Sequence, residues 1–72
     1  MDKQELMTFF SDFWKIDISK ISDNLKLDDT NLKDQTSIRL FQFFAKVESK
    51  FNVKFNDINK IICFGDILKE IV

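Results

Sequence analysis

Ser37 is the residue of this chain whose type and position best suit covalent chemistry. It opens a strongly apolar segment, residues 37–51, whose hydrophobic spacing predicts a helix. A serine in the first turn of a helix points its hydroxyl into solvent, beside backbone N–H groups without intrahelical partners. A phosphodiester there would be favoured by the helix dipole, by roughly 0.3–1 kcal/mol. Taken alone, Ser37 is best explained as a serine that satisfies backbone donors at a helix start, and attachment of an anionic group is the alternative that its position allows.

Other catalytic chemistry is difficult to assemble from these residues. The chain has no His, which excludes imidazole general-base catalysis and His-ligated metal sites. The single cysteine, Cys63, cannot form an internal disulfide, and we expect a buried or capping residue. Asp28 and Asp29 could bind a cation, but adjacent loop carboxylates usually form turns. Because no acid, base and nucleophile set can be named, we expect a non-catalytic protein without a metal.

The composition favours one small helical domain, residues 1–72. The chain is 44% hydrophobic and 32% charged, with nine Phe, one Gly and no Pro, which argues against a turn-dense β architecture. A formal net charge of -1 lacks the basic character of a nucleic-acid binder. No signal-peptide-like run follows Met1, and no stretch is apolar enough to span a bilayer. We therefore expect a cytoplasmic monomer with neither nucleic acid nor membrane as a partner.

Two segments precede the helix that begins at Ser37. Residues 2–15 are predicted to form an amphipathic helix, with Glu5 in its first turn, where a negative charge complements the dipole. In residues 17–36, crowded Ser, Asp, Asn and Thr side chains compete for helical backbone bonds. We expect an ordered loop there, pinned to the core by aliphatic side chains and holding one short helical turn. A loop of that length in a compact domain tends to be functional.

The central helix, residues 37–51, is the strongest prediction, with Thr36 as its N-cap and Asn52 at its end. Apolar side chains cover more than half of its circumference, so we expect contacts with other elements on two sides. These apolar residues are Ile38, Leu40, Phe41, Phe43, Phe44, Ala45, Val47 and Phe51. The remaining arc holds the polar residues Arg39, Gln42, Lys46, Ser49 and Lys50.

The rest of the chain completes a small bundle. Residues 53–55 look extended, and Asn56 or Asp57 is expected to cap a short helical piece that runs through Ile61. Residues 64–71 form the last helix. The predicted fold class is therefore all-α: three longer helices, one short helix, and a long loop between the first two helices.

The run Asp34-Gln35-Thr36-Ser37-Ile38, before an apolar helix closing in Phe51-Asn52-Val53-Lys54-Phe55, resembles the acyl carrier protein family. The resemblance continues in residues 27–32 and 62–67 and covers nearly the whole chain. It implies a four-helix bundle of acyl-carrier-protein type. It also implies that a phosphopantetheinyl transferase moves 4'-phosphopantetheine from coenzyme A onto Ser37. The thiol of that arm would hold acyl or aminoacyl groups as thioesters for a loading ligase or synthase.

Two departures from the family pattern concern the partners. Thr36 stands where acyl carriers usually have Asp and peptidyl carriers often have His. Fatty-acid carriers are generally acidic along this helix, whereas here Arg39, Lys46 and Lys50 occupy its polar arc. A specialised lipid, polyketide or nonribosomal pathway therefore fits better than standard fatty-acid biosynthesis.

Several roles remain open at this stage. The residues expected to contact partner enzymes are Thr36, Ile38, Arg39, Gln42 and Lys46, although a solvated helix face is the simpler interpretation. Some core positions of the central helix might also line an acyl-chain pocket, namely Phe41, Phe43, Phe44 and Val47. The alternative function is an unmodified carrier-like module that only binds other proteins.

Overall fold

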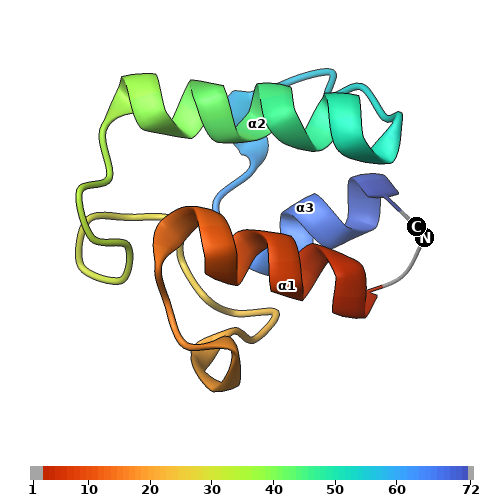
Figure 1. The fold of residues 1–72 in the computed structure, drawn as a ribbon. Helices are drawn as coiled ribbons and strands as arrows, with labels where there is room; N and C mark the ends of the chain where they lie inside the picture. The colour runs from red at the N-terminus through yellow and green to blue at the C-terminus, as the bar shows by residue number, and fades with distance from the viewer. Residues whose placement is uncertain (1–2, 72) are drawn as a thin grey trace.

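The computed structural model describes residues 3–71, which form an all-helical fold. Its α-helices are α1 (Lys3–Trp14), α2 (Ser37–Phe51) and α3 (Phe64–Ile71). Two 3₁₀ turns lie between them, η1 (Ile18–Lys20) and η2 (Ile58–Lys60). Helix α2 lies over α1 and α3 and runs opposite to α1 (Figure 1). None of the helices in this part of the chain is long and apolar enough to cross a bilayer.

The predicted all-helical class is confirmed, but the fourth helix is smaller than expected. The Asp57 side chain caps it by accepting from the Asn59 N–H at 3.1 Å, as one of the two expected caps. Only a single 3₁₀ turn follows, because the chain must become extended by Ile62. The Ile62 carbonyl accepts a hydrogen bond from the Leu27 N–H at 2.9 Å, which a continued helix could not offer.

The boundaries of the longer helices follow from their capping residues. Thr36 is extended at the start of α2, and Asn52 adopts the left-handed conformation at its end, with φ 55°. The expected bounds of α2 and of α3 are confirmed. Helix α1 ends one residue earlier than predicted because Lys15 adopts a left-handed conformation, with φ 56°. Residue 2, the predicted start of α1, lies outside the described residues.

Phe43, on α2, is the centre of an aromatic core. Its side chain is fully buried, and its ring centroid lies 5.1–5.8 Å from five other rings. These rings belong to Phe9, Phe10, Phe13, Trp14 and Phe44. Phe10 extends the cluster to α3 through an edge-to-face contact with Phe64 at 5.3 Å. Aromatic pairs of this kind add about 0.5–1.5 kcal/mol beyond simple burial, so this cluster holds the three helices together.

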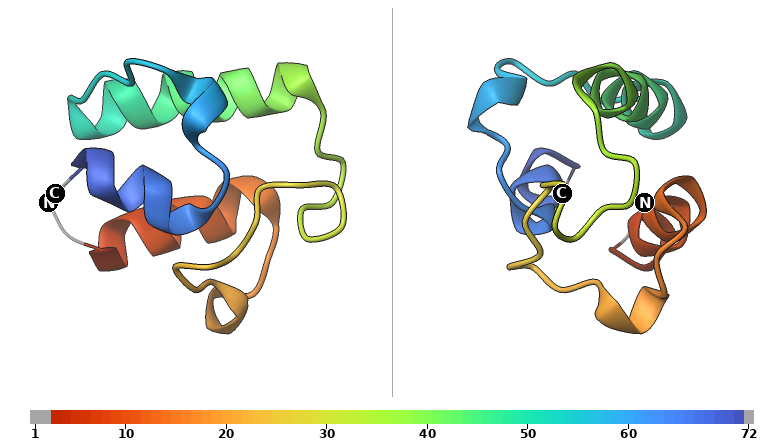
Figure 2. Two further views of the ribbon diagram at one scale, coloured as in Figure 1. Left: turned by 180° about the vertical axis from the view of Figure 1, so that it is seen from behind. Right: turned by 90° about the vertical axis from the view of Figure 1, so that its left-hand side faces the viewer.

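The long loop between α1 and α2 is ordered by backbone pairing as well as by burial. Its aliphatic anchors Ile21, Leu27 and Leu32 are buried, as the sequence predicts. The loop also pairs with the segment before α3 through an antiparallel bridge between Lys26 and Cys63. From there the loop crosses one end of the bundle and continues into α2 (Figure 2). This bridge was not predicted, because its two residues are distant in the sequence.

Asp66 caps the N-terminus of α3 from within its first turn. One of its carboxylate oxygens accepts from the Ile62 N–H at 2.9 Å and from the Cys63 N–H at 3.2 Å. These backbone hydrogen bonds, that of Ile62 first, hold the pKa of the Asp66 carboxyl below its ordinary value of 3.8. Asp17 has a similarly lowered pKa because it accepts from the backbone N–H of Ser19.

The Asp66 cap predicts a specific pH dependence of stability. Because the folded pKa of Asp66 lies below the unfolded value of 3.8, its stabilising effect is fully present above pH 3.8 and is lost as the pH falls further, through the folded pKa. Asp66→Asn should therefore reduce the acid sensitivity, and Asp17→Asn combined with it should reduce it further. Urea denaturation between about pH 7 and about pH 3 measures this. An Asp66→Asn variant as acid-sensitive as the wild type would contradict the assignment.

Candidate functional site

Ser37 is the first residue of α2, and its side chain is exposed to solvent. Thr36 is the N-cap, as predicted: its hydroxyl oxygen accepts from the Arg39 N–H at 3.2 Å. The N–H groups of Ser37 and Ile38 precede the first intrahelical hydrogen bonds and have no acceptor within the helix. The attachment candidate thus lies directly beside unpaired backbone donors.

The start of α2 differs electrostatically from the starts of the other two α-helices. Helix α1 carries Glu5 in its first turn and α3 carries Asp66, whereas α2 has no acidic residue there. A carboxylate in the first turn offsets the positive end of the helix dipole. Because α2 has none, its positive end is available to an anionic group on Ser37. The residues present therefore fit a phosphodiester at this position.

The loop before Ser37 is held in place by hydrogen bonds of its own. Gln35 Nε2 donates to the Leu27 carbonyl at 3.3 Å, and Asp34 takes the left-handed conformation with φ 61°. Further back, one Asp28 oxygen accepts from the Thr30 and Asn31 N–H groups at 3.2 and 3.1 Å. Asp28 therefore forms a turn, the simpler of the two roles considered for it.

Two large apolar side chains near Ser37 are exposed, although α2 does contact α1 through Phe43 and the segment after it through Phe44 and Phe55. Ile38 is 71% exposed and Phe41, one helical turn after Ser37, is 56% exposed. Ala45 extends this exposed strip along the helix. The face with Ile38 and Phe41 stays exposed because α1 and α3 both lie on the other side of α2 (Figure 1). The face that is buried carries Phe43, Phe44, Val47 and Phe51.

Arg39 also departs from its predicted place on the exposed polar arc. Its side chain is half-buried, with the guanidinium carbon 4.9 Å from the ring centroid of Phe13 and 5.4 Å from that of Trp14. Its Nη2 donates to the Phe13 carbonyl at 3.2 Å. Sequence reasoning missed this contact because nothing in the local pattern joins residues that are so far apart in the chain.

The other residues proposed to contact partners are accessible on the surface. Thr36, Gln42 and Lys46 are exposed, together with Ile38. Lys50 lies at the other end of α2, with its ammonium 5.8 Å from the centroid of the Phe9 ring. Thr36, Ser37 and Ile38 thus lie exposed at the N-terminal end of α2, whereas the Arg39 side chain turns inward.

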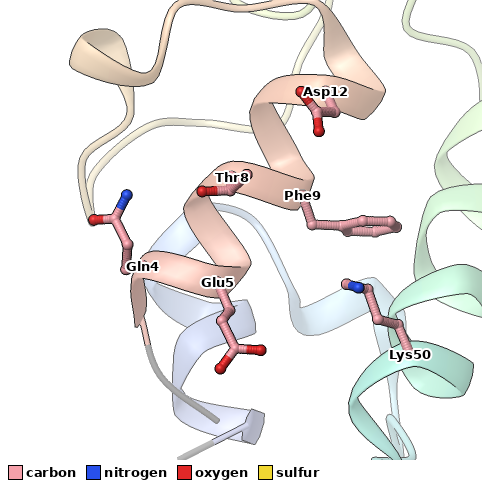
Figure 3. Close-up of a pocket in the computed structure, with 6 residues that line it drawn as sticks. All are labelled: Gln4, Glu5, Thr8, Phe9, Asp12 and Lys50. Carbon is pink, nitrogen blue, oxygen red and sulfur yellow. The ribbon is translucent and has the colours of Figure 1, made fainter.

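A groove of about 350 Å³ lies between α1 and the C-terminal half of α2. Figure 3 shows Phe9 and Lys50 converging across it from the two helices. The residues that line it are Gln4, Glu5, Thr8, Phe9, Asp12 and Lys50. None of them belongs to the group around Ser37, so this groove and the attachment candidate are separate places on the molecule.

No family model matches this sequence, and neither the curated proteins nor the solved structures give a significant match. The chemistry assigned to the site therefore depends on its own residues and on their placement at the start of α2.

Proposed function

We propose that this chain is an acyl-carrier-type protein that carries acyl or aminoacyl groups on a 4'-phosphopantetheine arm attached to Ser37. The observation that carries the proposal is an exposed serine at the first position of a 15-residue helix whose first turn contains no acidic residue. An anionic phosphodiester there would gain about 0.3–1 kcal/mol from the helix dipole. The resemblance of the surrounding residues to the carrier family supports the same assignment.

The modification would be catalysed by a separate phosphopantetheinyl transferase. The Ser37 oxygen would form a new bond to the phosphorus that bears the pantetheine arm, and the adenosine bisphosphate part of coenzyme A would leave. The hydroxyl proton would pass to a base on the transferase. The arm, when attached, supplies a thiol that holds cargo as a thioester.

Partner enzymes would dock on the exposed face of α2 beside Ser37. Ile38 and Phe41 provide an apolar centre, which exposed large side chains often mark on interaction surfaces. Gln42 and Lys46 border it and add no negative charge. A loading ligase or synthase of a specialised lipid, polyketide or nonribosomal pathway suits this surface better than an enzyme that expects an acidic carrier.

The proposal is tested by incubating the purified protein with coenzyme A and a promiscuous phosphopantetheinyl transferase. We expect the wild type to gain the mass of one phosphopantetheine group and Ser37→Ala to gain none. Ser49→Ala removes another exposed serine from the same helix and should be modified like the wild type. A wild type that several such transferases leave unmodified, or a Ser37→Ala variant that still gains mass, would contradict the site.

A second candidate function is an unmodified module that binds other proteins through α2. The exposed pair Ile38 and Phe41 favours it, because these side chains could anchor a partner without any arm. This alternative predicts that Phe41→Ala abolishes partner binding while Ser37→Ala leaves it intact.

A further inference from the structure

Arg39 links the first turn of α2 to the C-terminal end of α1. Its Nη2 donates to the carbonyl of Phe13, one of the last carbonyls of α1, at 3.2 Å. Helix α1 has no basic residue in its own last turn. A cation is favourable at a helix C-terminus, and Arg39 supplies it from the neighbouring helix.

The Arg39 guanidinium packs against two aromatic rings of α1. It lies over the rings of both Phe13 and Trp14, at 4.9 and 5.4 Å from their centroids. Its Nε is buried and has no hydrogen-bond partner. The contacts of the guanidinium, with the two rings and with the Phe13 carbonyl, all lie within the chain.

The end of α1 that receives Arg39 is well fixed. The Ile16 N–H donates to the Ser11 carbonyl at 3.3 Å, and the Ser11 hydroxyl donates to the Ile16 carbonyl at 2.6 Å. Trp14 is also almost fully buried in the aromatic core. The anchor for Arg39 is therefore a rigid part of the molecule.

The first turn of α2 has few other attachments. Ser37 and Ile38 are exposed, and Leu40 is half-buried. Arg39 is thus the first residue of the helix whose side chain packs on another helix, two residues after the attachment candidate. Leu40 packs against the core and Thr36 caps the helix, so the loss of Arg39 would remove the contact between this turn and α1 but not the turn itself.

We propose that Arg39 is a positioning residue for Ser37: by stacking on Phe13 and Trp14 it fixes the turn on which the transferase must find the serine hydroxyl. The expected effect on the modification of Ser37 depends on the proposed function. The contact of Arg39 with Phe13 and Trp14, called the clamp below, can be tested without a transferase. A small displacement of a reacting group is enough to slow a positioned reaction substantially.

The kinetic test compares Arg39→Met and Arg39→Lys with the wild type at a temperature where all are folded. We expect kcat/KM for the modification of Ser37 to fall about tenfold in Arg39→Met. Arg39→Lys should restore little, because lysine keeps the charge but cannot stack as a planar fork. Lys50→Met removes a cation from over Phe9 at the far end of α2, and should change the rate less than twofold. If Arg39→Lys were modified as fast as the wild type, residue 39 would act through its charge, for example on the transferase, and the proposal would be overturned.

Amide hydrogen exchange tests the clamp independently of the enzyme. In Arg39→Met we expect faster exchange at Leu40 and Phe41, with protection retained near Val47 at the other end of the helix. Unchanged exchange at Leu40 and Phe41 would overturn the proposal. A wild type that no transferase modifies would defeat the proposed function, while the exchange result would still decide whether the clamp exists.

Discussion

Phe43→Ala is expected to remove a large part of the free energy of unfolding of the protein. The side chain is fully buried and contacts rings from α1 and from its own helix, so its removal leaves a cavity at the centre of the core. A Phe-to-Ala change of this kind costs about 3–5 kcal/mol. A chain of this length has roughly 4–11 kcal/mol of stability in total. Urea denaturation followed by the fluorescence of Trp14, the single tryptophan, measures the loss.

Phe41→Ala is the matched control, because it removes the same side chain from the same helix. Phe41 is 56% exposed, so its replacement should cost much less than that of Phe43. Surface substitutions usually change stability by about 0.5 kcal/mol or less, and partial burial adds somewhat to this. Equal losses at the two positions would contradict the placement of Phe41 on the outer face of α2.

Gly65→Ala is expected to destabilise the protein, although alanine normally strengthens a helix. A Cβ atom at Gly65 would lie 2.8 Å from the backbone carbonyl oxygen of Asp23. That oxygen also accepts from the Gly65 N–H at 2.9 Å, so the two backbones would have to separate. Overpacking costs about 1–3 kcal/mol, and the lost hydrogen bond adds about 0.5–1.5 kcal/mol. Together these exceed the gain of about 1 kcal/mol from helix propensity.

The loss of stability in Gly65→Ala should arise where the start of α3 pairs with the loop between α1 and α2. The neighbouring hydrogen bond from the Phe64 N–H to the Leu25 carbonyl, 2.9 Å long, lies in the same pairing and should weaken with it. Lys69→Ala, at an exposed position of α3, provides the control and should leave urea stability nearly unchanged. A Gly65→Ala variant more stable than the wild type would show that the backbones do not approach so closely.

The local sequence was sufficient to predict where the helices lie. Thr36 and Asn52 bracket α2, and both act through their own backbone and side-chain preferences, which are visible without tertiary information. The same holds for Asp57 at η2. The placement of Ser37 at the start of an exposed helical turn follows directly from these caps.

What the sequence could not show depends on contacts between distant segments. On a helix that is apolar around most of its circumference, spacing alone cannot decide which apolar residues face outward. Ile38 and Phe41 became exposed because both neighbouring α-helices lie on the opposite side. The inward turn of Arg39 depends likewise on Phe13 and Trp14, which precede it by a whole loop.

The intact mass of the protein isolated from its native host is the most direct test of the central claim. If Ser37 carries the arm, the mass exceeds that of the unmodified protein by one phosphopantetheine group, with or without its cargo, and fragmentation places the addition on Ser37. Protein from cells that are actively using it, found entirely without an addition at Ser37, would contradict the carrier function and favour the interaction module.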